Sequence, residues 1–125
     1  MQKIMIVDDD KKIRNLYKKL LLLEHYFVLE AENSHAATRL LMKEQDVDLV
    51  LLDINMPLFD GSVLYNLLRR FDPKIKVIVT SAYPLDDQRN RIRAADDYYD
   101  KAQGTDVLVD KIRGALRETA SNGVH

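Results

Sequence analysis

The chain has 125 residues, of which 46% are hydrophobic and 31% are charged, with a formal net charge of −1 and no cysteine. This length fits one domain with a core, and the near-neutral charge argues against a basic field for nucleic acid or an anionic membrane. The missing cysteines exclude disulfides and thiolate metal sites. Since no apolar run is long enough to span a bilayer and no signal-peptide pattern is present, we expect a cytoplasmic protein without direct membrane or nucleic-acid contacts.

Short apolar runs alternate with helical patterns along the whole chain, which predicts alternating strands and helices. In chain order, the prediction is strand Lys3–Val7, helix Lys11–Glu24, strand Phe27–Ala31, helix Ser34–Lys43, strand Leu49–Leu52, helix Ser62–Phe71, strand Lys76–Thr80, a weak helical pattern at Pro84–Asp97, strand Tyr98–Tyr99 and helix Thr105–Glu118. Asp10 is the expected N-cap of the first helix. The last residues, SNGVH, are expected to fray.

The predicted helices carry apolar stripes that we expect to face a sheet. These stripes are Ile13, Leu16, Tyr17, Leu20 and Leu21; Ala37, Leu40 and Leu41; Val63, Leu64, Leu67 and Leu68; and Leu108, Ile112, Ala115 and Leu116. The alternation of strands with helices predicts an α/β fold, with one parallel sheet, right-handed crossovers and helices on both faces. In such open sheets, ligands bind at the carboxyl ends of the strands.

Reactive side chains follow four of the five predicted strands at these ends. In strand order they are Asp8, Asp9 and Asp10, then Asp53, then Thr80 and Ser81, and finally Lys101. Clustered carboxylates repel one another, and a bound cation relieves the repulsion. Oxygen ligands without histidine or cysteine favour Mg²⁺. A site with Mg²⁺, an ammonium and a hydroxyl suits a phosphoryl group, and a carboxylate can accept that group as an acyl phosphate.

Each of these residues also has an ordinary structural interpretation. The run Asp8–Asp10 could only cap the first helix, and Asp53 could only begin a turn. Lys101 could be a solvated surface residue, Ser81 a loop residue and Tyr98 a packing residue. The functional interpretation rests on their coincidence at one edge of one predicted sheet.

Four motifs, IMIVDDD, DLVLLDINMPLFDG, VIVTSAY and DDYYDK, occur in this order and cover nearly the whole chain. In their order and spacing the chain resembles the response-regulator receiver domains of two-component signalling. The resemblance implies a doubly wound (βα)5 fold of the flavodoxin and CheY type, with strand order 2-1-3-4-5. It also implies a receiver domain at residues 1–119, a tail at 120–125 and no output domain.

The resemblance further implies roles for individual residues. Asp53 is the implied phosphoacceptor, and Lys101 pairs with the phosphoryl oxygens. The implied Mg²⁺ ligands are Asp8, Asp9, Asp53 and the backbone carbonyl of Asn55. Ser81 and Tyr98 correspond to switch residues: Ser81 moves toward the phosphoryl group, Tyr98 turns inward, and the surface of the fourth helix, fifth strand and fifth helix changes. Asn55 and Tyr83 match positions that tune dephosphorylation.

The implied partner is a sensor histidine kinase or a phosphotransfer protein, and small donors such as acetyl phosphate also serve the family. We expect a monomer or weak dimer that is not an enzyme acting on an external substrate. Two alternatives stay open. One is a receiver-like interaction module that no longer accepts phosphate, and the other is a Mg²⁺-dependent aspartyl phosphatase or phosphotransferase.

Two features depart from the family pattern. Ala102 stands where the family usually has a proline after the lysine, in a cis bond. Since a cis bond before a residue other than proline costs roughly 2.5–4 kcal/mol, we expect either a trans Lys101–Ala102 bond with a shifted loop or a strained cis bond. The interval from Ser81 to Lys101 is 20 positions, shorter than is usual in the family. We therefore expect the fourth helix to be short, displaced or mobile.

Overall fold

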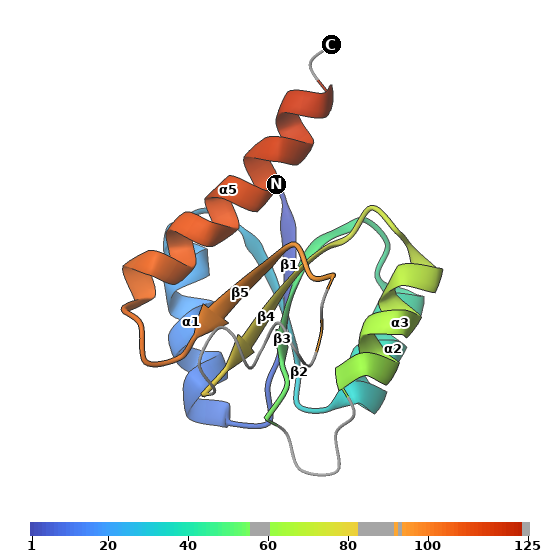
Figure 1. Cartoon of the computed structure of the whole chain (residues 1–125), viewed down its shortest axis with the longest axis horizontal. Helices are drawn as coiled ribbons and strands as arrows, with labels where there is room; N and C mark the ends of the chain where they lie inside the picture. Colours follow the sequence, from blue (N-terminus) through green and yellow to red (C-terminus); the bar gives the residue numbers. More distant parts are fainter. Residues whose placement is uncertain (56–60, 83–91, 93, 124–125) are drawn as a thin grey trace.

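The computed structural model describes residues 1–55, 61–82, 92 and 94–123. They form a single five-stranded sheet, flanked by helices (Figure 1). The strands are β1 (Lys3–Val7), β2 (Phe27–Ala31), β3 (Val47–Asp53), β4 (Lys76–Ser81) and β5 (Asp97–Asp100). The helices are α1 (Lys11–Leu23), α2 (Ser34–Lys43), α3 (Gly61–Phe71) and α5 (Thr105–Gly123).

The sheet order is β2-β1-β3-β4-β5, and every neighbouring pair is parallel. Helices α1 and α5 lie on one face of the sheet, and α2 and α3 lie on the other (Figure 1). The predicted α/β fold and the strand order 2-1-3-4-5 are therefore confirmed. The weak helical pattern at Pro84–Asp97 and the family position Tyr83 lie largely or wholly outside the described residues.

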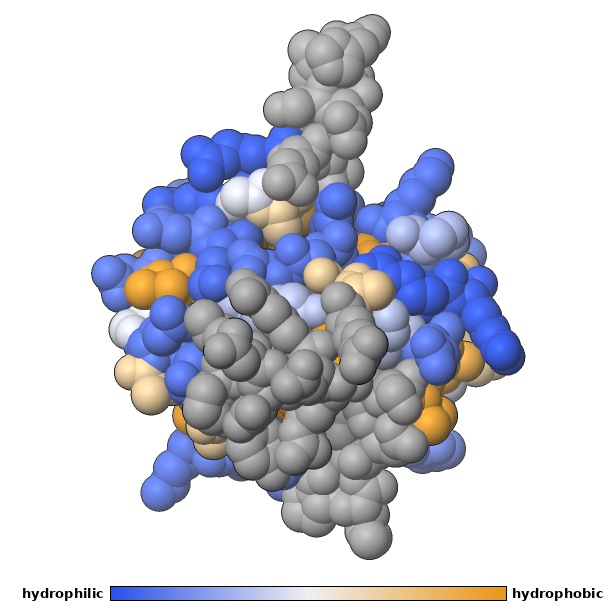
Figure 2. Space-filling model, viewed as in Figure 1, coloured by the Kyte–Doolittle hydropathy of each residue, from blue (hydrophilic) through white to orange (hydrophobic). Residues whose placement is uncertain are grey.

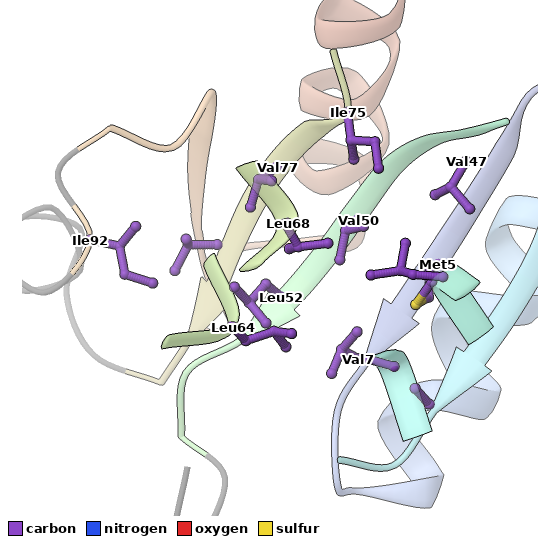
Figure 3. Packing of buried hydrophobic residues seen from close by; sticks show 14 of the residues in the cluster. Met5, Val7, Val47, Val50, Leu52, Leu64, Leu68, Ile75, Val77 and Ile92 are labelled. Atoms are coloured by element: carbon purple, nitrogen blue, oxygen red, sulfur yellow. The ribbon is translucent and has the colours of Figure 1, made fainter. Parts of the chain in front are cut away.

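Two hydrophobic clusters, one on each face of the sheet, form the core. On β3, Leu49 and Leu51 point into the cluster beneath α1 and α5, whereas Val50 and Leu52 point into the cluster beneath α2 and α3. Figure 3 shows Leu64 and Leu68 of α3 lying over the second of these sets. A strand covered on both faces needs apolar residues at consecutive positions, which explains why LVLL reads as an unbroken run.

Local capping sets the start of the first two helices. The carboxylate of Asp10 accepts hydrogen bonds from the backbone N–H groups of Lys12 and Ile13, at 2.9 and 3.4 Å. The amide oxygen of Asn33 accepts from the backbone of Ala36 at 2.8 Å. Both side chains satisfy donors that a helix leaves unpaired in its first turn. The predicted N-cap at Asp10 is confirmed.

Three expected core residues instead reach solvent. Leu16 is 44% exposed, Val63 is 62% exposed and Leu67 is 38% exposed. Among the described side chains of α3, Leu64 and Leu68 are buried against the sheet and Tyr65 packs beside them, because residues four apart share a face and the residues between them are turned away. The stripe predicted from composition was therefore too wide. Figure 2 shows a largely hydrophilic face, on which hydrophobic residues form small separate areas.

Several element ends also differ from the prediction. Strand β3 is longer than the apolar run Leu49–Leu52, because ladder pairing continues to Val47 opposite Lys3 and to Asp53 opposite Thr80. Helix α5 continues to Gly123, beyond the predicted end at Glu118. The apolar periodicity stops at Leu116, whereas the helical backbone continues to Gly123. Among the described residues, no helix has the length and apolarity to cross a membrane.

Candidate functional site

The carboxyl ends of the inner strands bring the candidate residues together. Strand register sets Asp53 opposite Thr80 and Ser81 opposite Asp100, and Asp8 follows β1 directly. The backbone N–H of Lys101 donates to the carbonyl of Ser81 at 2.8 Å, so the residue after β5 is held at the same edge. The parallel sheet thus gathers at one site groups that are as much as 93 positions apart in sequence.

Asp8 is buried and held on both carboxylate oxygens. Its Oδ1 accepts the backbone N–H of Asp10 at 2.9 Å, and its Oδ2 lies 3.0 Å from Nζ of Lys101. Its own carbonyl accepts a hydrogen bond from Arg14 at 2.7 Å. A charge in such a place is tolerated only when it is paired and hydrogen-bonded, and here it is both.

Asp53 is equally buried but less well satisfied. Its Oδ1 accepts the backbone N–H of Asn55 at 2.9 Å, and its Oδ2 lies 3.3 Å from Nζ of Lys101. Within the described residues, Oδ2 of Asp53 is a fully buried side-chain oxygen without a geometrically sound hydrogen bond. Its contact with Lys101 is an ion pair, which adds charge attraction without the geometry of a good hydrogen bond. A buried acceptor in this condition is costly unless a further group occupies the site.

Burial raises the pKa of Asp53 from 3.8 to about 6. The Asn55 amide opposes this rise, the charge of Asp8 adds to it, and Lys101 opposes it. Burial by itself would lower the pKa of Lys101, but the carboxylates of Asp53 and Asp8 outweigh burial and raise it. The Lys101 ammonium therefore lies between two buried carboxylates, of which Asp53 is the less fully hydrogen-bonded.

The donor set fits a hard divalent cation. Oxygens of Asp8, Asp9 and Asp53 all lie within 4.8 Å of one another, and Asp9 is exposed while the other two are buried. A site made of carboxylate oxygens, open to water on one side, matches the preference of Mg²⁺ for oxygen ligands and retained waters. The unsatisfied Oδ2 of Asp53 is the oxygen that such an ion would satisfy.

Asn55 connects the end of β3 to the end of β4. Its side-chain Oδ1 accepts the Ser81 hydroxyl at 2.6 Å and the Ala82 backbone N–H at 2.8 Å. The sequence predicted a backbone metal ligand at Asn55 and a position that tunes dephosphorylation, but it did not predict this pairing with Ser81. An amide two residues beyond Asp53 was the available signal, because neighbouring parallel strands end at the same edge.

Tyr98 already lies inward. Its side chain is 7% exposed, packs in the cluster beneath α2 and α3, and donates its hydroxyl proton to the carbonyl of Ile92. We expected this inward position to follow phosphorylation and the movement of Ser81. In the structure it coexists with a Ser81 hydroxyl that is bonded to Asn55.

The peptide bond between Lys101 and Ala102 is trans, since the described residues contain no cis bond. The Ala102 N–H donates to the carboxylate of Asp100 at 2.8 Å, and the Gln103 N–H donates to the Asp100 carbonyl at 2.8 Å. These bonds hold the turn after β5. A trans bond is thus compatible with a Lys101 ammonium that reaches both Asp8 and Asp53.

Comparison with known proteins agrees with this geometry. The family model described as the response regulator receiver domain matches residues 4–113, and the chain belongs to this family. The transcriptional regulatory protein CpxR of Klebsiella pneumoniae is 35% identical over 95% of this chain and 51% of its own length. The heme response regulator HssR of Staphylococcus aureus is 35% identical over 94% of this chain and 52% of its own. The chain therefore spans about half the length of these curated relatives.

Solved structures show the same fold. The response regulator TrrA of Thermotoga maritima, crystallised with Mg²⁺ and BeF, has a TM-score of 0.82 and 33% identity, covering 92% of this chain and 99% of its own. A CheY-like receiver domain from Methanospirillum hungatei has a TM-score of 0.88 and 28% identity, with 98% of each chain covered. TrrA has also been crystallised with the histidine kinase ThkA.

Proposed function

We propose that this chain is a phosphoacceptor receiver of a two-component system or phosphorelay, which is phosphorylated on Asp53. The observation that carries the proposal is the buried Asp53 carboxylate. One of its oxygens is held by the Asn55 N–H, and the other lies unsatisfied beside Lys101 and the carboxylates of Asp8 and Asp9. A carboxylate that is desolvated yet kept close to a cation is suited to act as a nucleophile.

In this proposal Mg²⁺ is held by Asp8, Asp9, Asp53 and the backbone carbonyl of Asn55. When bound, the ion supplies Lewis-acid stabilisation of the charge on the phosphoryl oxygens. Lys101 neutralises the same charge from the opposite side, and its ammonium is already placed 3.3 Å from Asp53. The crystal structure of TrrA with Mg²⁺ and BeF supports such a site in a relative.

The reaction moves one phosphoryl group to the chain. An oxygen of Asp53 attacks phosphorus, the bond from phosphorus to the imidazole nitrogen of a phosphohistidine breaks, and that nitrogen keeps the electron pair and takes up a proton. The donor is a sensor histidine kinase or a phosphotransfer protein, as the complex of ThkA with TrrA supports. Acetyl phosphate serves as a small donor. The chain is then a substrate and at most a catalyst of its own phosphorylation and dephosphorylation, acting in the cytoplasm as a monomer or weak dimer.

The added phosphoryl group acts as a local charge that biases a two-state element. Ser81 is the proposed donor to a phosphoryl oxygen, and its side chain lies at the end of the strand next to Asp53. Tyr98 on β5 carries the change to the surface formed by the segment before β5, β5 itself and α5. Since Tyr98 is already inward, the proposed switch stabilises this position.

Incubation with acetyl phosphate and Mg²⁺, followed by intact-mass measurement, tests the proposal. We expect an added phosphoryl mass on the natural chain and on Asp46→Asn, and none on Asp53→Asn. Asp46 is a matched control, because it is exposed, remote from the site and has a φ of 65° that asparagine tolerates. Absence of the added mass on the natural chain would favour the interaction module. Continuous hydrolysis of p-nitrophenyl phosphate that depends on Asp53 would favour the phosphatase.

A further inference from the structure

The side chain of Asn55 accepts the hydroxyl proton of Ser81, which a phosphoryl group on Asp53 would also need. Ser81 is completely buried, and its Oγ donates to Oδ1 of Asn55 at 2.6 Å. A serine hydroxyl has a single proton, so it cannot donate to Asn55 and to a phosphoryl oxygen at once. Delivery of that proton to a group on Asp53 therefore requires Ser81 to break its bond to Asn55.

The same amide oxygen also holds the residue after β4. The Ala82 N–H donates to Oδ1 of Asn55 at 2.8 Å, while the backbone N–H of Asn55 donates to Oδ1 of Asp53 at 2.9 Å. Because two donors meet at one atom, the amide must present its oxygen to β4. Asn55 thus contacts the proposed phosphoacceptor through its backbone and the proposed switch residue through its side chain.

Tyr98 is already in its inward position, so its rotation is not the step that limits the proposed switch. Its hydroxyl is bonded to the carbonyl of Ile92 while Ser81 is still bonded to Asn55. Burial of Tyr98 therefore does not depend on the release of Ser81. The bond between Ser81 and Asn55 is the part of the described site that must change when a phosphoryl group arrives.

We propose that the side chain of Asn55 is a positioning residue that latches the Ser81 hydroxyl and the Ala82 N–H in the unphosphorylated arrangement, so that it competes with the phosphoryl group for Ser81. This inference rests on the proposed function of Asp53. The competition involves one neutral hydrogen bond, whose free energy corresponds to roughly a threefold to tenfold change in the binding constant of a phosphoryl mimic. Removing the latch should tighten binding of a phosphoryl mimic by that factor.

A double-mutant cycle tests the latch with beryllofluoride and Mg²⁺ as the probe. The variants are Asn55→Ala, Ser81→Ala and the double variant, and the measured quantity is the Kd of beryllofluoride at saturating Mg²⁺. Asn55→Ala keeps the backbone carbonyl proposed as a metal ligand. We expect it to tighten beryllofluoride about threefold to tenfold, and to have a clearly smaller effect when Ser81 is already alanine, because only the bond to the Ala82 N–H is then lost.

Other outcomes overturn the latch. Weaker or unchanged beryllofluoride binding in Asn55→Ala shows that the amide does not compete for Ser81. An equal effect with and without the Ser81 hydroxyl assigns the change to the other contacts of Asn55, such as its bond to the Ala82 N–H. If the natural chain binds no beryllofluoride and takes no phosphoryl group from acetyl phosphate, then the proposed function fails and the latch fails with it. Phosphorylation of the natural chain without the expected cycle overturns the latch alone.

Discussion

Replacing Asp53 with asparagine should stabilise the metal-free protein at neutral pH. Burial holds the pKa of this carboxyl at about 6 in the folded chain, against 3.8 for the ordinary group. Between these values the folded state binds more protons than the unfolded state, so the free energy of unfolding falls as pH rises. At 1.36 kcal/mol per pKa unit, ionised Asp53 lowers the stability above pH 6 by about 3 kcal/mol relative to its protonated form.

Asparagine has nearly the same shape and stays neutral throughout. Its side-chain oxygen can still accept the Asn55 N–H, and Lys101 keeps its partner Asp8. In EDTA at pH 7.5, Asp53→Asn should therefore unfold at higher urea concentration than the natural chain, by about 1–3 kcal/mol. The gap should shrink as the pH falls through 6 and should close below about pH 3, where Asp53 is protonated in both folded and unfolded chains.

Urea unfolding followed by far-ultraviolet circular dichroism measures this difference, and Asp46→Asn serves as the control for the loss of one exposed charge. Addition of Mg²⁺ should stabilise the natural chain and leave Asp53→Asn nearly unchanged, because the ion offsets the repulsion only where the carboxylate is present. A variant that is less stable than the natural chain at pH 7.5 in EDTA would refute the reasoning. So would a gap that does not change between pH 4 and pH 7.5.

Four further substitutions test the packing and capping of the helices by the same unfolding measurement. Leu68→Ala should cost about 2–5 kcal/mol and its neighbour Leu67→Ala less than about 1 kcal/mol, because Leu68 is buried against the sheet and Leu67 is 38% exposed; similar costs would contradict the orientation of α3. Gly114→Ala should stabilise α5 by about 0.5–1 kcal/mol, since among the described residues no atom apart from its chain neighbours and the adjacent helix backbone lies within 4 Å of the added methyl group, and a loss of stability would show a hidden contact. Asp10→Ala should lower the free energy of unfolding by about 1 kcal/mol through the lost N-cap. An unchanged free energy of unfolding would show that the capping bonds do not stabilise the protein.

Much of the fold could be predicted from local patterns. An unbroken apolar run such as LVLL requires cover on both faces, and an aspartate before a helical stripe supplies its cap. Parallel strands then bring their carboxyl ends to one edge, which is why the neighbourhood of Asp8, Asp53, Ser81 and Lys101 followed from the order of the elements alone. The exact strand ends did not follow, because the ladder at Val47 depends on pairing with Lys3.

Only the tertiary structure decided how side chains are oriented toward neighbouring helices and strands. Periodicity allowed Val63 and Leu67 to face inward, but of this predicted stripe the structure buries Leu64 and Leu68 and leaves Val63 and Leu67 exposed. The bond from Ser81 to Asn55 joins the last residue of β4 to a residue two positions beyond β3, so no local pattern encodes it. The chain by itself determined which groups meet at the edge of the sheet, because that depends on the order of strands. Their hydrogen-bond partners depend on contacts across the sheet, which exist only after it has formed.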